Sequence, residues 1–183
     1  MLSALGVSYE AVATQVEELR EGAAPEVLVL ENARRKALAG LELAGAGEAA
    51  WSLGVDTEVV LDGRVLGKAA DAHEARERLL ALSGRAHEVL SGVVMVRRQG
   101  GVERSGVASS LVTFHELDKT TLDRYLASEE WRDRAGAYAI QGLGSTLIAR
   151  LDGDFSNVVG LPLQLLLDLV PELFPRISSD SLE

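Results

Sequence analysis

SLGVDTEVVLDGRVL, residues 52–66, is the stretch of the sequence that decides the fold. Apolar residues dominate Ser52–Leu61 and Arg64–Leu66, and Asp62-Gly63 separates the two runs. An Asp-Gly pair between apolar runs is a strong signal for a β-hairpin, because both residues tolerate the positive φ of a tight turn. The stretch therefore predicts two paired strands, with Asp56 as a charged residue inside the first.

Asp56 is an unusual residue for the inside of an apolar strand. A buried carboxylate costs several kcal/mol unless it is paired, bound to a metal or at an open edge. The structural alternative is an Asp on the solvent side of the strand, and the pattern alone favours neither interpretation. Lys68 follows the hairpin in Gly67-Lys68, where a short loop could aim its ammonium group back at Asp56. The two residues are therefore a candidate pair.

Three segments carry apolar residues at helical spacing, and we expect helices at Pro25–Leu43, Asp71–Leu82 and Leu117–Ala127. Gly45 and Gly47 are expected to end the first helix. Asp71 is the expected N-cap of the second, whose inward face would carry Ala72, Ala75, Leu79 and Leu82. A last helix is expected from Pro162 to about Leu173, before a flexible tail at residues 176–183.

Two long β-rich runs, Glu88–Arg98 and Val102–Phe114, are joined by Gly100-Gly101 and predict a second, central hairpin. Shorter strands are expected at Tyr138–Ile140 and Thr146–Leu151. Because hairpins alternate with helices, we predict an α/β fold, with α+β as the neighbouring alternative, around a mixed central sheet flanked by helices. No linker divides the chain, so we expect one domain over residues 1–183.

Composition and charge exclude several classes of protein. Of the 183 residues 47% are hydrophobic and 25% are charged, as in a globular protein with a real core. The absence of cysteine excludes disulfides and thiolate zinc sites. The formal net charge of −10 argues against binding to a nucleic-acid polymer, although local basic residues or a divalent cation can still bind a small anion. We therefore expect a cytoplasmic protein that contacts no membrane.

Two further stretches are unusual for pure packing. RAGAYAIQG, residues 134–142, is rich in small residues that allow a ligand to approach the backbone, and Gln141 offers an amide to a base edge. Phe155–Leu163 is interpreted as a loop that leads into a helix N-terminus, which stabilises anions. The alternative for this second stretch is an ordinary capped helix start.

Six segments, in this order and at this spacing, resemble the Maf family of nucleotide pyrophosphatases. The resemblance runs from about Leu2 to about Leu173. It implies the Maf/ITPase type of fold and an enzyme that hydrolyses nucleoside triphosphates to the monophosphate and pyrophosphate with a divalent metal. The segments are NARRKA (32–37), VDT (55–57), LGK (66–68), LSGRAH (82–87), AGAYAIQG (135–142) and SNVVGLP (156–162).

The resemblance also implies roles for the phosphate side of the site. Asp56 would be the general base that activates water for attack on the α-phosphorus. Lys36 and Lys68 would neutralise phosphate oxygens, because phosphoryl transfer chiefly needs positioning and charge neutralisation. Glu18 falls where the family carries an acidic residue near the metal, so Glu18 and Asp56 would hold Mg²⁺ or Mn²⁺.

For the base side, the Asp-Thr and Ile-Gln-Gly pattern resembles the branch that acts on dTTP and UTP more than the branch that acts on 7-methyl-GTP. Thr57 and Gln141 would help to select the base, and Arg85 would contact the substrate. The implied partner is a nucleotide substrate, and a homodimer is a candidate assembly. A non-catalytic nucleotide-binding or regulatory protein linked to septum formation is the alternative function, and a poorly folding gene product is a third interpretation.

The sequence departs from the family at three places. Family members begin with a strand and a Ser-x-Ser-Pro-Arg-Arg loop that binds the triphosphate, and this chain starts at the helix that follows. Either the start codon has been placed about 15 to 20 residues too late, or the chain is truly shorter. Ala69 replaces a usual Pro, which is expected to loosen the loop of Lys68. Asn32 replaces a usual Leu, which is expected to be a minor change of packing.

We expect the 183-residue chain to hydrolyse dTTP and UTP much more slowly than a relative that carries the arginine loop. A bidentate arginine clamp on phosphate contributes several kcal/mol to stabilisation of the transition state. Steady-state hydrolysis with Mg²⁺ measures the difference, and turnover equal to that of the relative would contradict the expectation.

Overall fold

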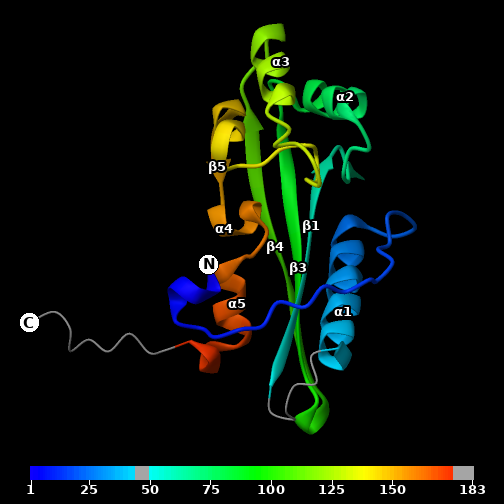
Figure 1. The fold of residues 1–183 in the computed structure, drawn as a ribbon, viewed down its shortest axis with the longest axis vertical. Coiled ribbons are helices and arrows are strands. Elements are labelled where there is room, and N and C mark those ends of the chain that lie inside the picture. Colours follow the sequence, from blue (N-terminus) through cyan, green and yellow to red (C-terminus); the bar gives the residue numbers. More distant parts are fainter. Residues whose placement is uncertain (44–49, 175–183) are drawn as a thin grey trace, which may run out of the picture.

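The computed structural model describes residues 1–43 and 50–174. Its centre is a twisted five-stranded sheet with the spatial order β2-β1-β3-β4-β5, in which β1, β3 and β4 are long (Figure 1). Every pairing in this sheet is antiparallel. The strands are β1 (Trp51–Leu61), β2 (Arg64–Val65), β3 (Ala86–Arg97), β4 (Val102–Phe114) and β5 (Ile148–Asp152).

Helices cover both faces and one end of the sheet. Figure 1 shows α1 on one side of the long strands, α4 and α5 on the other, and α2 and α3 together at one end. Short 3₁₀ helices occur at Leu2–Leu5, Gln99–Gly101, Gly142–Leu147 and Pro171–Leu173. No helix in the described part of the chain is long and apolar enough to cross a bilayer. The α-helices are α1 (Pro25–Leu43), α2 (Ala72–Leu82), α3 (Lys119–Ala127), α4 (Phe155–Val159) and α5 (Leu163–Leu169).

The predicted α/β class and most of the predicted elements are confirmed. Both hairpins form, and β3 lies at the centre of the sheet. Asp71 caps α2 by accepting from the backbone N–H of Glu74, and Asp118 caps α3 by accepting from that of Thr121. The mixture of parallel and antiparallel pairs does not occur among the described strands. Gly45, Gly47 and the tail at 176–183 lie outside the described residues, and the single domain stays a prediction.

Further details of the prediction are wrong. The stretch Phe155–Leu163 is not simply a loop, because Phe155–Val159 forms the short helix α4, which Asp154 caps. Tyr138–Ile140 forms no strand, because Gly136 and Ala137 both have positive φ and turn the chain immediately before it. Ala72 is exposed at the first turn of α2, so the inward face begins at Ala75. The last helix ends at Leu169, because Pro171 has no N–H to donate and disfavours helical geometry at the residue before it.

Two glycines allow α1 to lie directly on the backbone of the sheet. A Cβ atom on Gly54 of β1 would lie 2.0 Å from the carbonyl oxygen of Ala33, and one on Gly92 of β3 would lie 2.3 Å from that of Val29. Gly92 is the cross-strand partner of Asp56. The absence of side chains at these two positions therefore brings α1 next to the carboxylate of Asp56.

The main hydrophobic core lies at the end of the sheet that carries α2 and α3. Leu79 and Leu82 of α2 pack there with Phe114 of β4, Tyr125 of α3 and Trp131, and all five are at most 2% exposed. A second cluster joins α5 to the face of the sheet that points away from α1, and it includes Leu2. After the first 3₁₀ helix, residues 7–20 run from beside α5 across to α1 without regular secondary structure (Figure 1).

We expect Gly92→Ala to lower the free energy of unfolding by about 3 kcal/mol, because backbone atoms of α1 have no room to move away without loss of packing. Gly106→Ala on β4 is the control, since its Cβ would meet only the flexible side chain of Leu165, and about 1 kcal/mol or less is expected. Denaturant unfolding measures both, and equal losses would contradict the close contact of α1.

Candidate active site

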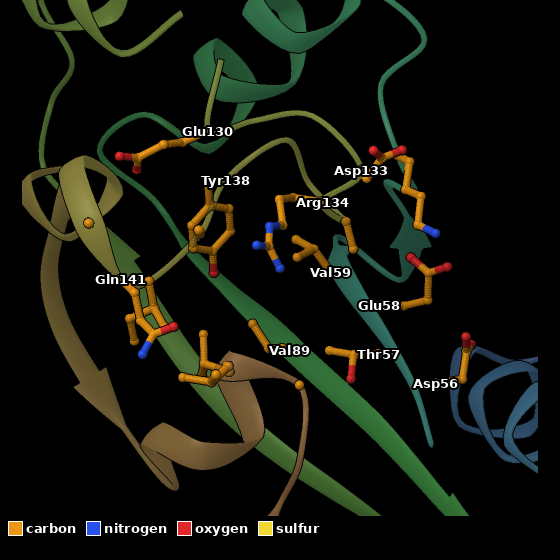
Figure 2. A pocket seen from close by; sticks show the side chains of 18 of the residues that line it. Asp56, Thr57, Glu58, Val59, Val89, Glu130, Asp133, Arg134, Tyr138 and Gln141 are labelled. Carbon is orange, nitrogen blue, oxygen red and sulfur yellow. The ribbon is translucent and has the colours of Figure 1, made fainter. Parts of the chain in front are cut away.

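A cleft of about 460 Å³ lies between α1, β1, the loop that follows β2 and the segment between α3 and β5. Figure 2 shows Asp56 and Glu58 at the end beside α1 and Gln141 at the other end, with Tyr138 between them. One end of the cleft is therefore rich in charged groups, and the other combines an amide with an aromatic ring.

Asp56 is held through both of its carboxylate oxygens. It is only 5% exposed. The ammonium group of Lys36 donates to its Oδ1 at 2.6 Å, and the amide of Asn32 donates to its Oδ2 at 3.1 Å. Asn32 and Lys36 are four residues apart on α1, so both point from one helical face toward β1.

Lys36 lies between two carboxylates. Its Nζ is 2.6 Å from Oδ1 of Asp56 and 2.6 Å from Oε1 of Glu18. Burial by itself would lower the pKa of Lys36, but the hydrogen bonds to Asp56 and Glu18 outweigh burial and raise the pKa above its ordinary value. Burial would likewise raise the pKa of Glu18, but Lys36 and the nearby charge of Lys68 hold it below its usual value. The contact between Lys36 and Glu18 therefore favours the charged form of both groups.

Glu58 is a third acidic group in the same wall of the cleft. Burial, together with the negative charges of Asp56 and Glu18, raises the pKa of Glu58 to about 7. Its Oε2 is buried and finds no hydrogen-bond partner within residues 1–43 and 50–174. Glu58 therefore changes charge near neutral pH, unlike an ordinary glutamate.

The loop that carries Lys68 is fixed from two sides. Lys68 forms a β-bridge with Ala135, and the carbonyl oxygen of Gly67 accepts from the backbone N–H of Gly136 at 2.8 Å. Arg78 of α2 also donates to the carbonyl of Gly67. These contacts support the loop at Ala69, and the expected loosening stays a prediction.

The middle of the cleft and its Gln141 end are held by a second set of polar contacts. Thr57 shares a hydrogen bond of 2.7 Å with Ser91 of β3. Glu130 accepts from the backbone N–H groups of Leu143 at 3.0 Å and Gly144 at 3.1 Å, immediately after Gln141. These contacts order the segment from which Gln141 projects.

Tyr138 is the aromatic wall of the cleft. Its hydroxyl forms a hydrogen bond of 2.8 Å with Nε2 of His87, and both rings pack edge-on against Phe114. Burial lowers the pKa of His87 to about 4, so the ring is neutral at pH 7. A neutral imidazole in an aromatic cluster supports the position of Tyr138 and adds no charge to the cleft.

Comparison with known proteins shows the family of this chain. Residues 1–173 match the family described as Maf-like protein. The chain belongs to the Maf family. A nucleoside triphosphate pyrophosphatase of Xylella fastidiosa (strain M23) is 43% identical over 165 residues, which cover 90% of this chain and 87% of the relative.

Two further relatives of the Maf chain carry a narrower name. The dTTP/UTP pyrophosphatase of Methylococcus capsulatus is 44% identical over 164 residues, which are 89% of this chain and 79% of that protein. The dTTP/UTP pyrophosphatase of Xanthomonas campestris pv. campestris is 45% identical over 165 residues, which are 89% of this chain and 86% of that protein.

The structure brings together most of the site residues that the sequence suggested for this Maf protein. Arg85 does not join the group, because its guanidinium group pairs with Asp62 in the β1–β2 turn at 2.7 Å and lies outside the cleft. Arg134 lines the cleft instead. The suggested residues that do line it are Glu18, Lys36, Asp56, Thr57, Lys68 and Gln141.

Sequence reasoning missed the roles of three residues, and two of them carried a detectable signal. Glu58 follows Asp56 by two positions, and strand residues at this spacing share one face. Asn32 precedes Lys36 by four positions, and helical residues at this spacing also share one face. Glu130 had no comparable signal, because its contacts are to backbone N–H groups of a later segment.

The two carboxylates beside Lys36 are too few to hold a divalent cation alone, so a substrate phosphate would have to supply further ligands. Within residues 1–43 and 50–174, no three Asp, Glu, His or Cys side chains gather as ligands of one metal ion. The carboxylates of Glu18 and Asp56 nevertheless lie close together, since both contact the ammonium group of Lys36. Mg²⁺ often takes one or two protein carboxylates and completes its shell with water and substrate phosphates. The donor chemistry of this pair is therefore compatible with Mg²⁺ or Mn²⁺.

We expect Glu58→Gln to stabilise the metal-free protein more at pH 8 than at pH 5, by about 1 to 3 kcal/mol. The folded pKa of about 7 lies above the ordinary value of 4.5, so the folded state binds more protons than the unfolded state between these values. Stability is therefore lost as the pH rises through this window, and Gln removes that loss.

Denaturant unfolding at both pH values, with a chelator present, measures the effect. Glu88→Gln is the control, since Glu88 is exposed on the neighbouring strand. A stability gain for Glu58→Gln that is the same at both pH values would show that Glu58 does not titrate in this range.

Proposed function

We propose that this chain hydrolyses nucleoside triphosphates to the monophosphate and pyrophosphate. The observation that carries the proposal is Asp56, buried at the charged end of the cleft with both oxygens oriented by α1. Family membership and the names of the relatives support the same reaction. The elongated cleft supports a ligand with an anionic end and an aromatic end, which describes a nucleotide.

In this proposal Asp56 accepts a proton from water as the water oxygen attacks the α-phosphorus. The bond from that phosphorus to the bridging oxygen breaks, and pyrophosphate leaves. Lys36 and Lys68 offset the negative charge that develops on phosphate oxygens. Lys36 already contacts Asp56, so the proton acceptor and one phosphate-binding cation are held side by side before substrate arrives.

We propose Glu18 and Asp56 as the residues that would hold a divalent metal. When bound, Mg²⁺ or Mn²⁺ would supply neutralisation of phosphate charge at the acidic end of the cleft. The shared contact of both carboxylates with Lys36 supports this assignment, because it shows that they can converge on a single cation.

The base would occupy the opposite end of the cleft. Gln141 carries both a donor and an acceptor, which suit the polar edge of a pyrimidine, and Thr57 adds a hydroxyl group. Tyr138 offers an aromatic wall. These features and the dTTP/UTP names of two relatives favour dTTP, UTP or modified pyrimidine nucleotides as substrates.

We further propose that the protein acts in the cytoplasm, where such nucleotides are used. We also propose that it forms a homodimer, which light scattering would test.

We expect Asp56→Asn to lower kcat for dTTP and UTP by about 10²- to 10⁴-fold, because the amide cannot accept the proton of the attacking water. Nucleotide binding should remain, since Asn keeps the size of the side chain. Asp62→Asn is the matched control, because Asp62 is exposed in the hairpin turn and contacts only Arg85 among the described side chains.

Release of monophosphate and pyrophosphate in equal amounts is the measurement, together with calorimetric binding of a non-hydrolysable triphosphate. Binding without turnover by the unmodified chain would favour the non-catalytic, regulatory alternative. Turnover by Asp56→Asn equal to that of Asp62→Asn would remove Asp56 from the role of general base.

A further inference from the structure

The side-chain amide of Asn32 joins an irregular segment of the chain to Asp56. Asn32 is 1% exposed. Its Oδ1 accepts from the backbone N–H of Leu19 at 2.7 Å, and its Nδ2 donates to the carbonyl oxygen of Leu19 at 2.9 Å. The same Nδ2 donates to Oδ2 of Asp56 at 3.1 Å. An asparagine amide has two N–H donors, so both are used by these two partners.

The contact with Leu19 matters because the neighbouring backbone has little other support. Residues 8–23 form no hydrogen bond with another backbone group in the described part of the chain. Side chains of α1 hold this segment instead. Asn32 binds Leu19 at two points, Arg35 donates to the carbonyl oxygen of Glu17 at 3.1 Å, and Lys36 pairs with Glu18. Asn32 therefore fixes the residue adjacent to Glu18.

The contact with Asp56 has a different consequence. Lys36 and Asn32 each hold one oxygen of the carboxylate, and because its carbon is fixed by the strand, these two hydrogen bonds set the rotation of the carboxylate plane. Lys36 is also bonded to Glu18 and, in the proposed reaction, it would bind phosphate. Asn32 has no such competing partner in the cleft. Its hydrogen bond is therefore the contact that can keep Asp56 oriented while Lys36 binds substrate.

We propose that Asn32 is a positioning residue for the hydrolysis reaction, which it serves by orienting Asp56 and by anchoring Glu18 at the cleft. This inference rests on the proposed function. The sequence suggested that Asn32 in place of a leucine is a minor change of packing, and its three hydrogen bonds show that this interpretation is wrong. A leucine could make none of them.

Two variants separate positioning from simple support of the fold. Asn32→Leu removes all three hydrogen bonds, and Asn32→Asp keeps the size of the side chain and the acceptor for Leu19 but removes both donors. Ser52→Ala is the matched control, because Ser52 on β1 donates to the carbonyl oxygen of Ala37 at 2.7 Å. That bond also joins β1 to α1 but does not touch the carboxylates.

We expect kcat for UTP to fall by about 10- to 100-fold in both Asn32 variants, with a smaller change in KM, because misorientation of Asp56 affects the chemical step more than binding. Ser52→Ala should stay within about twofold of the unmodified chain. Thermal unfolding confirms that each variant is folded. A kcat that Asn32→Asp leaves unchanged, or a loss no larger than that of Ser52→Ala, overturns the proposal.

Hydrogen–deuterium exchange of residues 8–23 supplies a readout that needs no turnover. Exchange should be faster in Asn32→Leu than in Ser52→Ala, because the N–H of Leu19 loses its acceptor. Equal exchange in these two variants overturns the anchoring role. If the unmodified chain hydrolyses no nucleotide, the proposed function fails and the positioning role falls with it. Faster exchange in Asn32→Leu would still show that Asn32 anchors the segment at Leu19.

Discussion

The close packing of α1 on the backbone of β1 and β3 is the constraint on which the candidate site depends. Two strand glycines, Gly54 and Gly92, leave no side chains between the helix and the sheet. Asn32 and Lys36 can then reach Asp56 across the gap that a Cβ would otherwise occupy. A side chain at either glycine would move the helix outward and lengthen both contacts. The packing of α1 and the contacts of the Asp56 carboxylate therefore depend on the same two glycines.

The charge balance of the cleft follows from that geometry. Glu18 and Glu58 lie near Asp56, and the half-buried Lys36 offsets the charges of Asp56 and Glu18 through direct contacts. Glu58 has no such partner among the described residues, and its pKa is therefore raised to about 7 by burial and by its acidic neighbours. An acidic wall of this kind attracts cations, which agrees with the divalent metal that we propose for this site.

The opposite end of the cleft is built by contacts between loops. The bridge between Lys68 and Ala135 joins the loop after β2 to the small-residue segment that ends in Gln141. Glu130 then holds the backbone just beyond Gln141, and His87 supports Tyr138 from below the cleft. Because one bridge ties the two loops together, Lys68 and the segment that ends in Gln141 keep a fixed spacing.

The sequence by itself determined the family, the α/β class, both hairpins, the cap of α2, and six residues that line one cleft, because these follow from local patterns and ordered motifs. Only the tertiary structure decided that Arg85 pairs with Asp62, that Tyr138–Ile140 is a loop, and that Asn32 links Leu19 to Asp56. The physical reason is that hydrogen bonds and charge shifts of this kind depend on which distant segments meet, and that meeting is set by the packing of α1 and the loops on the sheet.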